Sequence, residues 1–129
     1  MGALDAKTRY ALLAALDLAE HSRPDRPSTI REVASRTGIP PKYLVHILLR
    51  LKRRALVNST RGAKGGYWLL RPAELISMAE VIGAVSSAPR QAPASAGAHG
   101  AAIVRLWTEA ERRRQELLAR TSLADLLRT

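Results

Sequence analysis

The 129-residue chain has a formal charge of +10, with 47% hydrophobic residues and neither cysteine nor phenylalanine. This size and mixture are typical of one globular domain, or of a small domain with a helical extension. Without cysteine the chain supplies no thiolate to zinc or to an iron–sulfur cluster, and its three histidines are scattered, so we expect no metal site and no cofactor. The chain shows no apolar run near the ~20 residues of a membrane-spanning helix and no secretory signal. We therefore expect a cytoplasmic protein with no membrane partner.

The positive charge is concentrated in the first part of the chain. Residues 1–71 hold 14 Lys and Arg against 5 Asp and Glu, whereas residues 72–129 hold 7 against 6. Between Val33 and Ala73 there are nine basic residues and no acidic one. A solvated face normally mixes both signs, so this segregation favours a polyanionic partner, with DNA or RNA first and an anionic membrane surface second. A basic surface that only aids solubility is the third interpretation.

Three helices are predicted in the first half of the chain. The first runs from Asp5 or Ala6 to about His21, and a proline-containing loop follows it. A capping box of Thr29 and Glu32 starts the second helix, which ends near Gly38. The third runs from Pro41 to about Arg54, and its apolar side comprises Leu44, Ile47, Leu48, Leu51 and Ala55. Two short helices joined by a tight turn with glycine form a helix-turn-helix unit, whose second helix enters the major groove of DNA.

Residues 56–70 predict a β-hairpin directly after this unit. Strands at 56–60 and 67–70 flank the glycine-rich turn 61–66, which makes a basic and flexible tip. A hairpin in this position is a wing. A loop that cradles a nucleotide phosphate is the weaker interpretation, because the glycine spacing fits no such motif and no helix begins directly after it.

The remaining chain is predicted to be helical except for one loop. A capping box of Ser77 and Glu80 starts a helix to about Val85, and residues 86–100 are rich in Ala, Ser, Pro and Gly. Further helices are expected at 101–120 and 123–127. We therefore expect a winged helix-turn-helix domain at 1–86, a flexible loop at 87–100, and a dimerisation helix with a short C-terminal helix at 101–129. The fold class is mainly α with a small β-hairpin wing.

The sequence resembles the Rrf-two family of bacterial transcription regulators, which includes an iron–sulfur cluster regulator and a cysteine-metabolism repressor. The residues that carry the resemblance are Lys7–Leu12, Leu16–Ala19, Gly38–Leu44, Leu51-Lys52, Leu56-Val57, Val81-Ile82, Ala84-Val85 and, most specifically, the wing sequence Arg61–Tyr67. The resemblance implies a homodimer, joined by a long helix that crosses its twin, and a near-palindromic operator, in most members bound for repression. The dimer contacts are then expected from Ile103, Leu106, Trp107, Ala110 and Leu117. Packing of this helix against the first helix of the same chain is the alternative.

Cluster-binding members place three cysteines in the loop before the dimerisation helix, and this chain has none there. The resemblance therefore implies a cluster-free member, which responds to a small-molecule or protein effector if it responds to any signal. His99 lies near the place where some members supply a histidine ligand, but a solvated surface residue is the favoured interpretation.

The expected DNA contacts lie on the recognition helix, on the wing and at one helix start. They are Thr29, Pro41, Lys42, Tyr43, Val45, His46, Arg50, Arg53, Arg61, Gly62 and Lys64. The side chains early in the recognition helix reach base edges or flanking phosphates. Arg61 and Gly62 are expected in the minor groove, and Lys64, Arg50 and Arg53 at phosphates. For Thr29 the alternative is helix capping alone, and for Tyr43 it is a ring packed under the helix.

Two residues of the recognition helix depart from the pattern of related regulators. Val45 falls where some relatives carry a Glu that reads cytosine, and His46 falls where many carry Gln. Valine cannot accept that hydrogen bond, although it can contact a thymine methyl group. We therefore expect a different operator from that of the cluster-dependent regulators.

The sequence thus predicts a DNA-binding transcription regulator. A non-specific architectural DNA-binding protein is the alternative, because the base-reading positions are few. An enzyme is not expected, since the chain has no cysteine nucleophile, no Ser/His/acid pattern and no convergent pair of carboxylates. A winged-helix module that binds another protein is a further alternative. The segment of nine basic residues without an acidic one argues against it, because such a module does not need this charge.

Overall fold

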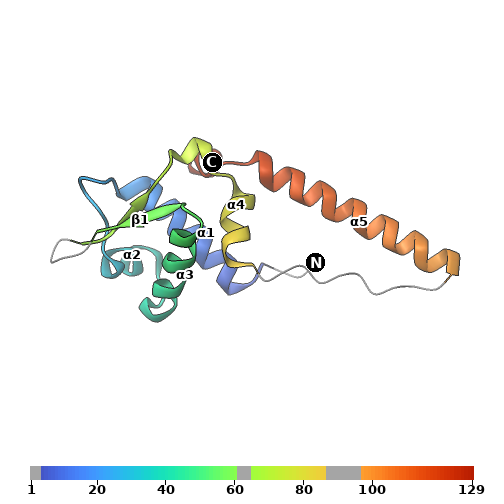
Figure 1. Ribbon diagram of the computed structural model, residues 1–129, viewed down its shortest axis with the longest axis horizontal. Helices are drawn as coiled ribbons and strands as arrows, with labels where there is room; N and C mark the ends of the chain where they lie inside the picture. The colour runs from blue at the N-terminus through green and yellow to red at the C-terminus, as the bar shows by residue number, and fades with distance from the viewer. Residues whose placement is uncertain (1–3, 61–64, 87–96) are drawn as a thin grey trace.

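The computed structural model of the protein describes residues 4–60, 65–86 and 97–129. In chain order its elements are α1 (Ala6–His21), α2 (Ile30–Thr37), α3 (Pro41–Arg53), β1 (Val57–Ser59), β2 (Tyr67–Leu69), the 3-10 helix η1 (Ala73–Leu75), α4 (Met78–Val85), α5 (Gly97–Arg120) and α6 (Leu123–Leu127). Helices α1–α4 and the hairpin form a head, from which α5 extends as a long rod (Figure 1). The predicted fold class, mainly α with a small β-hairpin and a long C-terminal helix, is confirmed.

Local hydrogen bonds explain where the first helices begin and end. The Asp5 carboxylate accepts from the Thr8 amide at 2.8 Å and caps α1. At α2 the capping box is complete: the Thr29 hydroxyl accepts from the Glu32 amide at 3.1 Å, and the Glu32 carboxylate accepts from the Thr29 amide at 2.9 Å. Gly38 then ends α2 with φ +76°, a left-handed conformation that favours glycine. The turn between α2 and α3 is therefore encoded locally.

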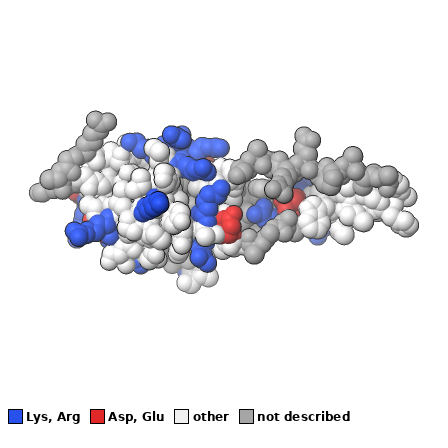
Figure 2. All heavy atoms as spheres, turned by 90° about the horizontal axis from the view of Figure 1, so that it is seen from below, with Lys and Arg blue, Asp and Glu red and all other residues white. Residues whose placement is uncertain are grey.

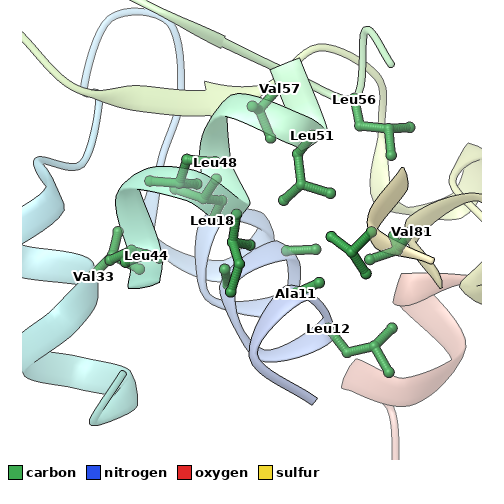
Figure 3. Packing of buried hydrophobic residues seen from close by; sticks show 14 of the residues in the cluster. Ala11, Leu12, Leu18, Val33, Leu44, Leu48, Leu51, Leu56, Val57 and Val81 are labelled. Atoms are coloured by element: carbon green, nitrogen blue, oxygen red, sulfur yellow. The ribbon is translucent and has the colours of Figure 1, made fainter. Parts of the chain in front are cut away.

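The core is aliphatic and centred on α1, which contacts α2, α3, α4, α6 and β2. Figure 3 shows side chains from α1, α2, α3, α4 and β1 packed together in this core. The largest fully buried side chains are Leu18, Val33, Ile39, Leu44, Leu48, Leu51, Val57, Ile76, Val81, Val85 and Leu123. Burying one such side chain contributes about 1.5–3 kcal/mol. This core therefore holds the helix-turn-helix unit rigidly on α1.

The wing is attached to the loop that precedes α2. Its strands pair antiparallel, with Val57 opposite Leu69, Asn58 opposite Trp68 and Ser59 opposite Tyr67. The Ser28 amide donates to the Tyr67 carbonyl at 3.0 Å, and the Tyr67 amide donates to the Ser28 carbonyl at 2.7 Å. Gly66 allows this close approach, because a Cβ atom there would lie 2.5 Å from the Ser28 carbonyl oxygen. The base of the wing is thus tied to the chain segment that enters the helix-turn-helix unit.

Two details of the predicted elements need correction. Helix periodicity places Ala55 on the buried side of α3, but α3 ends at Arg53, and Ala55 is exposed with φ +57°. Its neighbour Leu56 is buried instead, because the turn redirects the chain into β1. The long helix begins at Gly97 rather than at Ala101, so residues 97–100 are helical and not part of a loop. Gly97 and Gly100 both lower the helix propensity of this turn, which is why the sequence does not predict it to be helical.

Candidate DNA-binding surface

Helix α3 has one buried and one exposed side. Leu44, Ile47, Leu48 and Leu51 are buried in the core of the head. The residues predicted to contact DNA from this helix are all exposed: Pro41, Lys42, Tyr43, Val45, His46, Arg50 and Arg53. Figure 2 views the protein from below, onto the end of the head that carries the start of α3. Lys and Arg side chains are spread over this surface. The recognition helix is therefore rigidly backed, and its outer side is basic.

Tyr43 lies at the edge of this exposed side that faces α1. Its ring centroid is 6.4 Å from that of Tyr10, with the ring planes tilted by 37°. The guanidinium carbon of Arg9 lies 5.6 Å from the centre of the Tyr10 ring, in the range of a cation–π interaction. The side chain of Tyr43 nevertheless remains 57% exposed. The ring thus packs on α1 and is still accessible from outside.

Two basic side chains of α3 make tertiary contacts that the sequence analysis missed. Arg50 Nη1 donates to the Val85 carbonyl at 3.1 Å, a carbonyl in the last turn of α4 that has no partner within the helix itself. Lys52 Nζ donates to the Ser59 hydroxyl in β1 at 2.8 Å. These partners lie 35 and 7 residues away along the chain, a separation that helix periodicity does not reveal. Arg50, predicted to bind a phosphate, therefore also joins α3 to α4.

The wing tip residues Arg61, Gly62 and Lys64 lie outside the described residues. The base of the turn is described: the Thr60 amide donates to the Gly66 carbonyl at 3.0 Å. The Gly66 amide in turn donates to the Thr60 hydroxyl at 3.3 Å. These two bonds close the hairpin directly below its basic tip.

The amide of Thr29 is occupied in the structure. It donates to the carboxylate of Glu32, whose pKa this hydrogen bond lowers below the usual value. A phosphate at this amide would have to displace a negatively charged carboxylate. The geometry therefore supports the capping alternative for Thr29.

A partly buried ion pair joins α1 to α2. Arg36 Nε and Nη2 donate to the two carboxylate oxygens of Asp17, each at 2.9 Å, and Nη2 also donates to the Ser28 hydroxyl at 2.8 Å. Asp17 and Ser28 are buried, and the Asp17 carboxylate raises the pKa of Arg36 above its usual value. A charged residue between the apolar Leu16 and Leu18 is the sequence signal that could have revealed this pair.

Helix α5 carries an exposed apolar stripe. The side chains of Ile103, Leu106, Trp107 and Leu117 are 64, 71, 49 and 57% exposed, and Ala110 between them is half-buried. No residue of α5 is buried, and its contacts within the chain include α4. Among the described helices none combines the length and the apolar character needed to cross a membrane.

The opposite side of α5 is charged. Arg112 pairs with Glu109 at 2.6 Å and also with Glu116, and Glu109 accepts from Arg113 at 3.0 Å. Hydrogen bonds from Arg112 and Arg113 lower the pKa of Glu109 to about 2. Helix α5 is thus amphipathic, with a solvated charged side and an apolar side that lacks cover within the described chain.

A helix-turn-helix unit on a basic head, followed by a β-hairpin, defines a winged helix-turn-helix DNA-binding protein. Residues 4–129 match the profile of the Rrf2 family, described as "Iron-dependent Transcriptional regulator". The chain therefore belongs to the Rrf2 (Rrf-two) family. It is a DNA-binding transcription regulator and not an enzyme.

Individual relatives agree with this assignment. A putative HTH-type transcriptional regulator, rrf2-like, of Rhodobacter capsulatus is 45% identical over 78 residues, which are 59% of this chain and 52% of that protein. The putative HTH-type transcriptional regulator ORF2 of Azotobacter vinelandii is 36% identical over 129 residues, covering 96% of this chain and 78% of its own length. The solved structure of CymR, the global cysteine regulator of B. subtilis, superposes with a TM-score of 0.83 at 26% identity, covering 98% of this chain and 96% of that one.

The family description implies iron, but the residues of this chain do not fit a cluster held by cysteine, since the chain has none. Within the three described segments no three His, Asp or Glu side chains gather as metal ligands would. His99 lies exposed in the first turn of α5.

Proposed function

We propose that the protein is a sequence-specific transcriptional repressor that binds a near-palindromic operator as a homodimer and without an iron–sulfur cluster. The observation that carries the proposal is the outer side of α3, basic, exposed and backed by a rigid core. The major groove of B-DNA admits a single α-helix, so α3 could enter it with this side facing the bases. The absence of cysteine from the chain supports regulation without a cysteine-ligated cluster.

The proposed base and phosphate contacts follow from the positions along α3. Lys42, His46 and Arg53 recur at helical spacing on the part of the helix furthest from the core. Val45 and Leu49 are 44 and 43% exposed, and suit apolar contact with thymine methyl groups. Pro41 and Tyr43 lie at the start and inner edge of this surface. Hydrogen-bond donors and methyl contacts together would read a defined sequence.

The wing supplies the second set of proposed contacts. Arg61 and Gly62 are assigned to the minor groove and Lys64 to a phosphate. The pairing of Ser28 with Tyr67 supports this assignment, because it holds the base of the wing next to the helix-turn-helix unit.

The proposed dimer uses the apolar stripe of α5, made of Ile103, Leu106, Trp107, Ala110 and Leu117. Large exposed apolar stripes on a soluble regulator are typical of an interface. A second copy of α5, crossing the first, would cover the stripe and leave the charged side in water. Two heads would then face half-sites about one helical turn, roughly 34–36 Å, apart.

Sequencing of genomic fragments retained by the full chain tests the proposal. A recovered palindrome supports a sequence-specific regulator, and random fragments support the architectural alternative. On the recovered site Lys42→Ala should weaken binding at least about fivefold, because it removes one charge-assisted contact. The matched control is Arg105→Ala, which removes a charge from the polar side of α5 and should leave the affinity unchanged. Equal losses in both variants would remove α3 from the interface.

A further inference from the structure

A hollow of about 440 Å³ lies between the start of α1 and the inner edge of α3. Its lining includes Lys7 and Tyr10 from α1, and Tyr43, His46, Ile47 and Arg50 from α3. The volume is in the range of sites that hold small organic molecules. The DNA contacts proposed for Lys42 and Arg53 do not use this hollow, because neither residue lines it.

The lining combines aromatic and apolar surface with positive charge. The rings of Tyr10 and Tyr43 and the side chain of Ile47 form the apolar part. Lys7 and Arg50 provide the charge, and among the described residues no acidic one lines the hollow. The Asp5 carboxylate interacts with Lys7 and keeps its charge while it accepts from the Thr8 amide, so Lys7 and Arg50 still leave a net positive charge at the hollow. The site therefore suits a ligand with a flat apolar body and one negative charge.

The hydrogen bond from Arg50 to α4 orders the Arg50 side chain before any ligand binds. Its bond to the Val85 carbonyl uses one of the five guanidinium N–H groups and holds the side chain in place. A pre-ordered guanidinium binds carboxylate with a smaller entropy loss than a free one. Tyrosine rings favour offset stacking with another aromatic ring.

We propose that this hollow is an effector site for a small aromatic carboxylate. The ring of the ligand stacks on Tyr10 and Tyr43, and the carboxylate pairs with Lys7 and Arg50. The effect of the ligand on DNA binding rests on the proposed function, whereas the site itself does not. The ligand lies against Tyr43 and His46, in the turns of α3 that are proposed to face DNA. Because it also neutralises nearby cations, the ligand lowers the affinity for DNA.

Calorimetric titration of the full chain with 2-naphthoate, in the absence of DNA, tests the site itself. The expected result is saturable binding at one site per chain. The neutral analogue 2-naphthamide should bind at least about tenfold more weakly, because it lacks the charge that pairs with Lys7 and Arg50. Lys7→Gln should weaken 2-naphthoate binding by at least about tenfold as well. Arg105→Gln, which removes a charge from α5, should leave it unchanged.

Three results would rule out the binding site: no binding of 2-naphthoate at millimolar concentration, equal binding of the amide, or equal binding by the Lys7→Gln variant. A hollow covered by a second copy of the chain would give the first of these results.

The effector role is tested separately, by the retention of genomic DNA fragments on the full chain with and without 2-naphthoate. DNA binding that 2-naphthoate weakens in the parent chain, but not in Lys7→Gln, supports the effector role. A chain that binds 2-naphthoate but no DNA refutes the regulator and leaves the site standing, whereas DNA binding unaffected by bound 2-naphthoate refutes the effector role.

Discussion

The guanidinium of Arg36 in α2 holds the carboxylate of Asp17 in α1 through two hydrogen bonds of 2.9 Å. The same guanidinium donates to the Ser28 hydroxyl, and the backbone of Ser28 pairs with Tyr67 in the wing. One side chain therefore links the central helix, the helix-turn-helix unit and the wing. The relative position of the two proposed DNA-reading elements depends on this link.

Arg36→Ala should destabilise the head strongly, because it leaves the Asp17 carboxylate buried without its partner. Removing one member of a buried ion pair costs about 3–5 kcal/mol, and we expect the lower end because Arg36 is partly exposed. Urea unfolding followed by circular dichroism measures the change. Arg31→Ala, at an exposed position of the same helix, should change the free energy of unfolding by less than about 0.5 kcal/mol. Similar losses in the two variants would refute the role of the pair.

Gly66→Ala should separate the wing from the loop before α2. The added Cβ would lie 2.5 Å from the Ser28 carbonyl oxygen, which is backbone and cannot rotate away. We expect a loss of about 1–3 kcal/mol in unfolding free energy and weaker binding to the recovered operator. Gly83→Ala in α4 is the control, since an added Cβ there meets nothing within 4 Å. That variant should be more stable than the parent by about 0.5–1 kcal/mol, and a stable, fully active Gly66→Ala variant would contradict the close approach.

Leu106→Glu should convert the proposed dimer to a monomer. It places a charge in the apolar stripe of α5, where the side chain it replaces is 71% exposed in the single chain. Thr108→Glu adds the same charge to the same helix outside the stripe. Sedimentation equilibrium should give a dimer for the parent and for Thr108→Glu, and a monomer for Leu106→Glu. A monomeric parent at micromolar concentration would exclude the proposed interface.

The capping carboxylate of Glu32 should contribute to the acid sensitivity of the head. The hydrogen bond from the Thr29 amide lowers the pKa of Glu32 below its usual 4.5. A carboxyl group with a lowered folded-state pKa stabilises the fold above its unfolded-state pKa, and this contribution is lost as the pH falls through the folded-state pKa. The thermal midpoint of Glu32→Gln should therefore fall less than that of the parent when the pH drops from about 5 to 3. Parallel decreases in the two proteins would show that this carboxylate has no role.

The elements that could be predicted from the sequence are those specified by neighbouring residues. Thr29 and Glu32 stand three residues apart, and Gly38 follows at the helix end, so the bounds of α2 follow from local chemistry. The bond from Arg50 to Val85 could not be predicted, because it depends on how α3 and α4 pack. Helix periodicity places Ala55 on the buried side for a related reason: the apolar spacing continues in the sequence after α3 has ended at Arg53.

The affinity of the full chain for the recovered operator, compared with a scrambled duplex of equal length, tests the central claim most directly. Fluorescence anisotropy at about 0.15 M salt is the measurement, since phosphate contacts alone bind any sequence and weaken as salt rises. A sequence-specific regulator should bind the operator at least about 10³-fold more tightly than the scrambled duplex. Equal affinities for the two duplexes would contradict the account and indicate an architectural DNA-binding protein.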